Sequence, residues 1–289
     1  MSLARKPRTH VGVIGLGIIG SRVASALRHN GFQAYVWNRT PKPAPNFLGS
    51  AAEVAETCEA IQLFVADAAA TMAVLEAIGD ALTPDHLVMV HGTIGEEGTL
   101  RAADWVRSKG AQFLDAPFTG SKGAAEKRQL VYYVGGDTAV VERARPVLEA
   151  SGKAILHVGD VGQAAVVKIA TNLISAATVQ VLAEALALTM KAGIGPQVLA
   201  DAIEENAMRS GVTDLKLPKM ITGDYEPHFS LKHMFKDVQL GVRQAEAMGL
   251  DLPVTSTIAG ALFSGLSQGW GDLDYAAVAK RFAPKREQR

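Results

Sequence analysis

The feature that most constrains the fold is a glycine-rich segment near the start of the chain. A strand-like run, residues 11–14, precedes a G-x-G-x-x-G pattern, and a helical pattern follows it. The pattern consists of Gly15, Leu16, Gly17, Ile18, Ile19 and Gly20. In such a turn the first glycine allows a tight bend, the second lets the backbone approach a pyrophosphate, and the third lets the helix pack on the strand. Because strand and helix flank the glycines, the segment predicts a dinucleotide-binding turn.

Short apolar runs alternate with helical patterns through the first half of the chain. We expect strands at Val11–Ile14, Ala34–Trp37, Ile61–Val65, Leu87–Val90, Gln112–Leu114, Val131–Val134 and Ala154–His157. Helices are expected between several of them, at Ile19–Arg28, Ala51–Glu56, Thr71–Ile78 and Thr99–Lys109. This alternation favours a parallel sheet with helices on both faces. Residues 1–160 are therefore predicted to form an α/β, Rossmann-type, doubly wound domain.

The pattern changes after Gly159. From Val161 to Ala192 apolar residues recur at helical spacing, and the segment ends at a Gly and Pro cluster, residues 193–196. Further helices are expected at Gln197–Ala207, Leu231–Met248, Val254–Ser267 and Asp274–Phe282. No strand-like alternation follows His157. Residues 161–289 are therefore predicted to form an all-helical C-terminal domain.

Charge and cysteine content exclude several classes of function. The 289 residues include 29 Lys and Arg and 29 Asp and Glu, so the formal net charge is zero. A neutral chain lacks the overall basic charge typical of nucleic-acid binding and of attraction to anionic membranes, so we expect neither partner. Cys58 is the single cysteine, and no Cys and His cluster has zinc-ligand spacing. We therefore expect no internal disulfide and no metal site.

The most apolar stretch, Ile169–Met190, contains Asn172, Gln180 and Glu184. Such side chains are costly in lipid, so we expect a buried helix and not a membrane span. The first ten residues lack the apolar core of a signal peptide, and the low cysteine content suits a reducing compartment. These features predict a cytoplasmic protein.

Cofactor preference should be decided at the end of the second strand. An NAD site usually places Asp or Glu there to bind the ribose 2′-hydroxyl, and this chain has neither between Trp37 and Pro41. Arg39 can pair with a 2′-phosphate, and Asn38 and Thr40 can add neutral hydrogen bonds. The segment predicts NADP(H) as the cofactor. The alternative is a surface arginine in a turn.

Three further motifs follow the glycine pattern. Residues 115–125 read DAPFTGSKGAA, residues 162–172 read GQAAVVKIATN, and residues 229–237 read FSLKHMFKD. In this order they resemble the substrate-binding, catalytic-helix and Lys-Asp motifs of the β-hydroxyacid dehydrogenases, which are 6-phosphogluconate dehydrogenase-like proteins. The amino-acid sequences of residues 118–122 and of the last motif look most like those of the glyoxylate/succinic semialdehyde reductase branch.

The resemblance implies that the chain reduces a small anionic aldehyde acid with NADPH, or oxidises the matching hydroxy acid. It also implies an NADP-binding domain, residues 1–160, and a helical domain, residues 161–289, that completes the substrate site. In this family the helical domain commonly forms the dimer, so a homodimer or tetramer is expected.

Lys168 and Asn172 are the catalytic residues that the second motif implies. Carbonyl reduction needs a proton on the developing alkoxide, and Lys168 can supply it. Asn172 follows by four residues, so it shares a helix face with Lys168 and can orient it or the substrate. Without the motif, the favoured alternative would be a solvated lysine beside a polar neighbour.

The last motif implies three further site residues. Lys236 would reach the cofactor, Asp237 would support the catalytic site, and Phe229 would wall the substrate pocket. The alternatives are a surface ion pair at the start of a helix and a core aromatic side chain.

The substrate carboxylate is expected at the loop formed by Gly120, Ser121 and Lys122. The Ser121 hydroxyl and nearby backbone N–H groups can bind it, and Lys122 can add charge attraction. The alternative is that Thr119 and Ser121 cap a turn.

Two strand ends should also contact ligands. Val65, Ala66 and Asp67 should pass the ribose or adenine of the cofactor, and Thr93 should contact cofactor or substrate.

The chain departs from the family pattern at two places. Around Thr93 the family usually has Ser-Thr followed two residues later by Pro, whereas residues 91–95 read HGTIG, with Gly92 and Gly95. Arg128 stands where relatives often have glycine, and we assign it no function.

Three alternatives compete with the aldehyde-acid reductase. One is another β-hydroxyacid dehydrogenase, such as one acting on 3-hydroxyisobutyrate, which NAD specificity and a preference for oxidation would support. Another is an imine reductase, a group that generally lacks the lysine found here at Lys168. The third is a non-catalytic NADP-binding protein, which would have no need of Lys168, Asn172 and Ser121 together.

Overall fold

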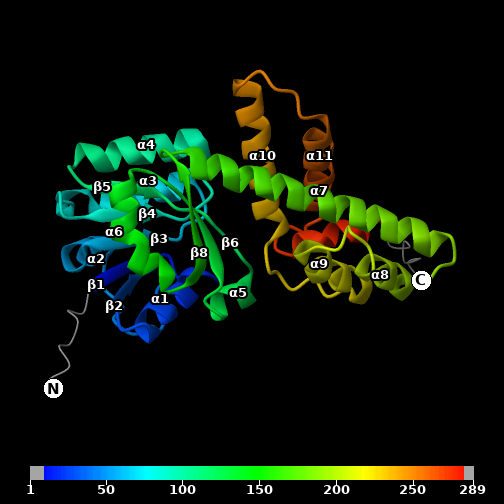
Figure 1. The fold of residues 1–289 in the computed structure, drawn as a ribbon, viewed down its shortest axis with the longest axis horizontal. Helices are drawn as coiled ribbons and strands as arrows, with labels where there is room; N and C mark the ends of the chain where they lie inside the picture. Colours follow the sequence, from blue (N-terminus) through cyan, green and yellow to red (C-terminus); the bar gives the residue numbers. More distant parts are fainter. Residues whose placement is uncertain (1–9, 283–289) are drawn as a thin grey trace. The chain divides into compact units, whose positions relative to one another are not determined.

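The computed structural model describes residues 10–282. The chain divides between Lys168 and Ile169 into two compact units (Figure 1). The functional roles predicted for residues 1–160 and 161–289 stay predictions.

The first unit is built on an eight-stranded sheet in the order β2-β1-β3-β4-β5-β7-β6, with β8 paired to β7. Its strands are β1 (His10–Ile14), β2 (Gln33–Trp37), β3 (Ala60–Leu63), β4 (Leu87–Val90), β5 (Gln112–Asp115), β6 (Phe118–Thr119), β7 (Leu130–Gly135) and β8 (Gly152–Gly159). Strands β1 to β5 are parallel, which confirms the predicted fold class.

The sheet is mixed and not wholly parallel, because β7 runs antiparallel to β5 and β6. Only the short helix α5 (Lys122–Glu126) and a turn separate β6 from β7. A parallel crossover needs a dozen or more residues, so this short connection reverses the chain direction. The two-residue strand β6 was not predicted.

Helices cover both faces of this sheet. They are α1 (Gly20–His29), α2 (Ala51–Thr57), α3 (Ala68–Ile78), α4 (Gly95–Ser108) and α6 (Thr138–Glu149), with the 3₁₀ turn η1 (Gly79–Ala81) after α3. One core contains side chains of α1 and α6, and the other contains side chains of α2, α3 and α4. Alternate strand residues supply the two cores: Val11 and Val13 face one, and Ile14 faces the other. This is the doubly wound arrangement expected from the sequence.

Sequence patterns missed α6. Pro146 lies inside it, and proline disfavours a helix interior. The helix forms because Asp137 caps it, with Oδ1 accepting from the backbone N–H groups of Ala139 and Val140, and because its buried side chains join the core.

The second unit is helical. It contains most of α7 (Gln163–Lys191), then α8 (Pro196–Glu204), α9 (Gly211–Thr222), α10 (Leu231–Ala247), α11 (Pro253–Ser267) and the 3₁₀ helix η2 (Tyr275–Phe282). Between residues 169 and 282 the described chain forms no strand beyond an isolated bridge of Ser230 with Asp274. Helix α9 was not predicted, since Pro218 lies inside it, but a capping box of Ser210 and Thr213 begins it.

Helix α7 is long and apolar enough to cross a membrane by length and composition, a test that core helices of soluble proteins also pass. Asn172 and Gln180 are both buried within the protein. Gln180 Nε2 donates to Glu184 Oε1 at 2.8 Å. Polar side chains satisfied by protein groups in this way favour a helix packed against protein.

Candidate active site

The glycine turn follows β1. Strand β2 lies on one side of β1 and β3 on the other, so the strand order reverses at this point of the sheet. Gly15 has φ +101°, a left-handed conformation, and its N–H donates to Trp37 O at 2.9 Å. A Cβ at Gly15 would collide with Phe64 O, and one at Gly20 would collide with Gly15 O. A Cβ at Gly17 would meet nothing within 4 Å, so this backbone is open on one side. The turn therefore fits a dinucleotide pyrophosphate, which must approach the backbone closely.

The segment after β2 is tied to this turn. Asn38 Oδ1 accepts from Leu16 N at 2.8 Å, and Asn38 Nδ2 donates to Thr40 O at 2.6 Å. Lys42 Nζ donates to Leu16 O at 2.9 Å. Asn38 thus holds the glycine turn in place, while Arg39 is exposed. Sequence reasoning missed Lys42, although a second cation three residues after Arg39 was visible in the sequence.

The ends of β3 and β4 pack closely through a glycine. A Cβ at Gly92 would lie 2.5 Å from Val65 O, and Gly95 has φ +78°. Gly92 and Gly95, which depart from the family pattern around Thr93, thus occupy positions where the backbone itself requires glycine. Thr93 lies half-buried between them, and Asp67 caps α3 by accepting from the N–H of Ala70.

The predicted substrate loop begins with Gly120 at φ +133°. Ser121 precedes α5, and its side chain makes no capping hydrogen bond to that helix. Lys122 is the first residue of α5.

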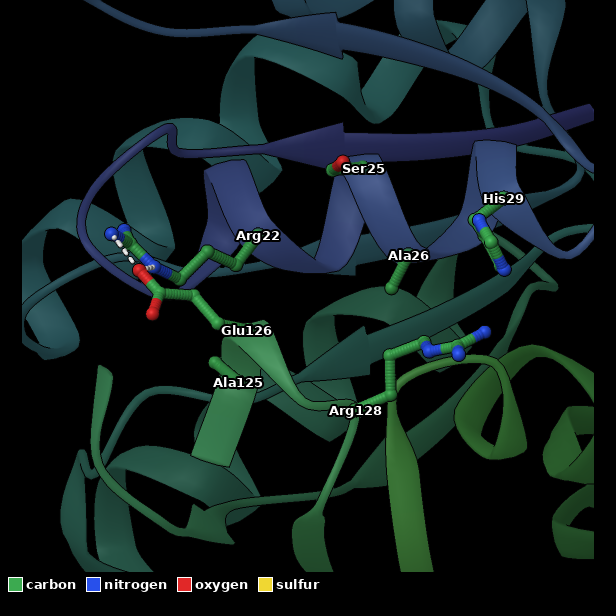
Figure 2. A pocket seen from close by; sticks show the side chains of 7 residues that line it. All are labelled: Arg22, Ser25, Ala26, His29, Ala125, Glu126 and Arg128. Carbon is green, nitrogen blue, oxygen red and sulfur yellow. Dashed lines mark hydrogen bonds and ion pairs between the residues drawn. The ribbon is translucent and has the colours of Figure 1, made fainter. Parts of the chain in front are cut away.

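A shallow groove of about 300 Å³ lies between α1 and α5 (Figure 2). Arg22 pairs with Glu126 at 2.7 Å across it, which joins the glycine-turn helix to the helix after Ser121. Arg128 and His29 also line the groove. Arg128 has φ 57°, a left-handed conformation that glycine adopts without strain, and this explains the glycine expected there.

Asp115, at the end of β5, contacts the first turn of α7. Its Oδ2 accepts from Gly162 N at 3.2 Å and from Ala165 N at 2.9 Å, and its side chain is buried. Burial raises the pKa of Asp115 to about 7, and the two backbone hydrogen bonds partly oppose that rise. Lys168 follows Ala165 by one helical turn. Sequence reasoning placed Asp115 in a motif but gave it no role.

His91 lies two residues before Thr93. Its Nδ1 donates to Ala116 O at 2.6 Å, and its ring stacks on Phe64 with centroids 4.3 Å apart. Burial lowers its pKa to about 4, so the ring is neutral near pH 7. It fixes the end of β4 to the residue after Asp115.

In the second unit the structure brings together three predicted residues. Asn172 Nδ2 donates to Asp237 Oδ2 at 2.6 Å, and Lys236 Nζ lies 2.8 Å from Asp237 Oδ1. Asp237 and Asn172 are 1% and 7% exposed, so this carboxylate joins α7 to α10 in a buried setting. The surface-ion-pair alternative does not describe Asp237.

Phe229 lies in an aromatic cluster with Tyr275 and His233. Its backbone N–H donates to Asp274 Oδ2 at 3.2 Å. Asp274 is fully buried and also binds Lys216 Nζ at 2.8 Å. Phe229 is therefore fixed by its ring contacts and by its backbone hydrogen bond, as a packed aromatic side chain would be. Among the described residues, no three His, Cys, Asp or Glu side chains form a possible metal site.

The chain is similar to known proteins along nearly its whole length. Residues 10–159 match the NAD-binding domain of 6-phosphogluconate dehydrogenase, and residues 162–282 match the NAD-binding region of NADP-dependent 3-hydroxyisobutyrate dehydrogenase. Glyoxylate/succinic semialdehyde reductase 1 of Arabidopsis thaliana is 31% identical, over 96% of this chain and 99% of the relative.

Two solved structures have the same fold. The 3-hydroxyisobutyrate dehydrogenase of Salmonella typhimurium has a TM-score of 0.87 at 28% identity, covering 94% of this chain and 99% of that one. The Mycobacterium tuberculosis 3-hydroxyisobutyrate dehydrogenase has a TM-score of 0.86 at 25% identity, covering 96% and 99%.

Proposed function

This chain belongs to the β-hydroxyacid dehydrogenase family of NAD(P)-dependent oxidoreductases acting on CH-OH groups, and we propose that it reduces small aldehyde acids with NADPH. Glyoxylate and succinic semialdehyde are the proposed substrates, and the matching hydroxy acids are the products. The observation that carries the proposal is the relative that is 31% identical over nearly both whole chains and bears that activity in its name.

Lys168 is the proposed proton donor. The chemistry that NADPH would supply, when bound at the glycine turn, is hydride transfer to the carbonyl carbon. Lys168, in the second turn of α7, gives a proton to the carbonyl oxygen as its negative charge develops. Ser121, whose hydroxyl does not cap α5, and Lys122 bind the substrate carboxylate. Asn172, held by Asp237, orients the substrate or the lysine.

The preference for NADP(H) rests on the segment after β2. Residues 38–42 contain two cations, Arg39 and Lys42, and no carboxylate. Lys42 is anchored beside the glycine turn through Leu16 O. A cation pair binds a 2′-phosphate, whereas the missing Asp or Glu would have bound a 2′-hydroxyl.

A homodimer, or a tetramer made from it, is proposed to form through the helical unit. Ile174, Val181 and Leu188 recur every seven residues along α7 and are 67%, 58% and 72% exposed. An apolar stripe of this kind is unfavourable in water and suits a second copy of the same helix. Substituting Val181 with Glu should yield monomers in sedimentation, whereas unchanged association would contradict the proposal.

We also propose that the protein is cytoplasmic. Cys58 is a buried free thiol whose pKa is raised to about 12 by burial, and the chain offers it no disulfide partner. A single cysteine with no partner for an internal disulfide suits a reducing compartment. Fractionation that places the native protein in an oxidising compartment would contradict this.

A second candidate function is oxidation of 3-hydroxyisobutyrate. Both structural neighbours named above carry that activity in their names, as does the description matched by residues 162–282. The two candidates differ in substrate and direction, and Lys168 would accept the proton in the oxidation.

Steady-state assays separate the candidates. NADPH consumption should be rapid with glyoxylate or succinic semialdehyde, whereas NADPH formation from NADP+ should be slow with 3-hydroxyisobutyrate. Lys168→Ala should lower kcat by about 10²- to 10⁴-fold without changing the circular dichroism spectrum. Lys191→Ala, at the exposed end of the same helix, is the matched control and should retain full activity. A folded wild-type enzyme that reduces no aldehyde acid would contradict the proposal.

A further inference from the structure

A buried carboxylate connects the sheet of the first unit to the first turn of α7. Asp115 ends β5, and its Oδ2 accepts from the N–H groups of Gly162 and Ala165 at 3.2 and 2.9 Å. Its side chain is 1% exposed. Burying a carboxylate is costly even with hydrogen bonds, and burial raises the pKa of Asp115 to about 7. Apolar packing at this position would avoid that cost, so the carboxylate points to a role beyond packing.

Ala116, which follows Asp115 at the end of β5, is held by hydrogen bonds to the end of β4. Ala116 N donates to Val90 O at 2.9 Å, and Ala116 O accepts from His91 Nδ1 at 2.6 Å. Residues 117–121 continue directly from this point to Ser121. The start of α7 is therefore anchored to Asp115, the last residue of β5, and the substrate loop begins from Ala116, the residue that follows it.

We propose that Asp115 is a positioning residue for the reaction. By binding the two N–H groups at the start of α7, it fixes the place of Lys168 relative to the Ser121 loop. This inference rests on the proposed function, in which Lys168 transfers the proton and Ser121 binds the substrate. A displacement of about 1 Å between reacting groups can cost about a hundredfold in rate, so such an anchor matters for kcat.

The charge of Asp115 has a second consequence. A negative charge at a helix N-terminus is favourable, and it also stabilises a cation in the next turn. Glu96 of α4 lies against Gly162 and is another carboxylate beside this turn. Asp160 and His157 precede α7, and His91 is neutral near pH 7. These groups are unchanged when only Asp115 is replaced. A change in the pH dependence of kcat/KM therefore reports on the loss of the Asp115 charge.

Three variants test the proposal. Asp115→Ala removes both acceptors. Asp115→Asn keeps an oxygen acceptor but removes the charge. Asp137→Ala is the matched control, because Asp137 also accepts two backbone N–H groups at a helix start in the same unit, but from α6.

The expected result is a separation of kcat from KM. Asp115→Ala should lower kcat for the aldehyde acid by about 10- to 100-fold and change the KM for NADPH by less than about twofold. Asp115→Asn should recover most of kcat. Its alkaline limb of kcat/KM should nevertheless move to lower pH, because the lost negative charge no longer favours protonated Lys168. Asp137→Ala should lower stability and leave kcat and the pH profile unchanged.

Amide hydrogen exchange supplies a readout that needs no activity. Exchange in residues 160–168 should accelerate in Asp115→Ala, remain near wild type in Asp115→Asn, and be unchanged in Asp137→Ala. The proposal is overturned if Asp115→Ala keeps wild-type kcat, or if its loss of activity only follows its loss of folded protein. If the wild type reduces no aldehyde acid, the proposed function fails. The exchange result then decides whether Asp115 holds the helix.

Discussion

Asn172 and Asp237 are 65 residues apart in sequence and are joined by a buried hydrogen bond of 2.6 Å from Nδ2 to Oδ2. Lys236 lies 2.8 Å from the other oxygen of the same carboxylate. The Asp237 carboxylate of α10 thus accepts a hydrogen bond from the Asn172 amide of α7 and pairs with the Lys236 cation of its own helix. An uncharged donor at Asn172 suits this carboxylate, whereas a second acceptor there would repel it.

Replacing Asn172 with Asp should destabilise the protein in a pH-dependent manner. The variant places two carboxyl groups together in a buried site, so the pKa of the pair is raised. Stability is then retained at low pH, where one group is protonated, and is lost as the pH rises through the raised value. At about pH 8 the loss should be about 3 kcal/mol or more in urea unfolding, since the two buried carboxylates repel each other and Lys236 beside Asp237 only partly offsets this repulsion. Asn206→Asp, at an exposed position, should show no such pH dependence.

Lys216→Met should be strongly destabilising because it leaves Asp274 buried without its cation. The pair is 2.8 Å apart, with side-chain exposures of 6% and 0%. Breaking a buried pair from one side costs about 3–5 kcal/mol. Lys232→Met removes the pair with Asp272, which is also close, at 2.6 Å, but exposed. That control should cost far less, because solvent screens an exposed pair. Equal losses of stability in thermal unfolding would show that burial does not set the cost of breaking these pairs.

Arg39→Asp should shift cofactor preference from NADPH toward NADH. The new carboxylate can accept from a ribose 2′-hydroxyl and repels a 2′-phosphate. Together with Lys42→Ala, the ratio of kcat/KM for NADPH to that for NADH should fall by about a hundredfold or more, as expected when charge-assisted bonds are lost. Arg101→Asp on the exposed face of α4 should leave the ratio unchanged. If the ratio of kcat/KM for NADPH to that for NADH is unchanged in the Arg39 variant, Arg39 does not bind the 2′-phosphate.

His91 should make the protein sensitive to acid. Its pKa is lowered to about 4 in the folded protein, below the ordinary value of 6.5, so the unfolded chain binds the proton more readily. The contribution of neutral His91 to the free energy of unfolding is therefore fully present above about pH 6.5. It is lost as the pH falls toward 4, by up to about 3 kcal/mol. Asp115, with its raised pKa, has the opposite pH dependence in this window.

Comparison of the wild type with His91→Gln isolates this contribution, because Asp115 is present in both. The loss of unfolding free energy between about pH 6.5 and 4 should be smaller in the variant. His29→Gln, at an exposed position, should behave as wild type. Parallel acid-unfolding curves for all three proteins would show that His91 does not titrate in this way.

Local patterns were sufficient for most of the fold and failed where a local signal was weak. The strands β1 to β5 and the helices between them follow from hydrophobic periodicity and from the glycine turn. Helices α6 and α9 each contain a proline, and caps and core packing outweigh its cost. The antiparallel β7 depends on the short α5 connection, which no single strand pattern indicates.

The candidate site divides in the same way. Motif spacing singled out Lys168, Asn172, Asp237 and Ser121 as chemical groups, and the missing carboxylate after β2 indicated NADP(H). The spacing did not indicate that Asp115 contacts the start of α7, that Asn38 holds the glycine turn, or that Gly92 is required by Val65.

Local sequence patterns were enough to predict the strands β1 to β5, the dinucleotide-binding turn and the residue types available for proton transfer and anion binding. They were enough because these depend on neighbours a few residues apart, within one strand, turn or helix. Which distant groups meet, such as Asp115 with Ala165 and Asn172 with Asp237, became visible in the folded chain. Those contacts depend on how whole elements pack, and packing combines many weak interactions that no short pattern contains.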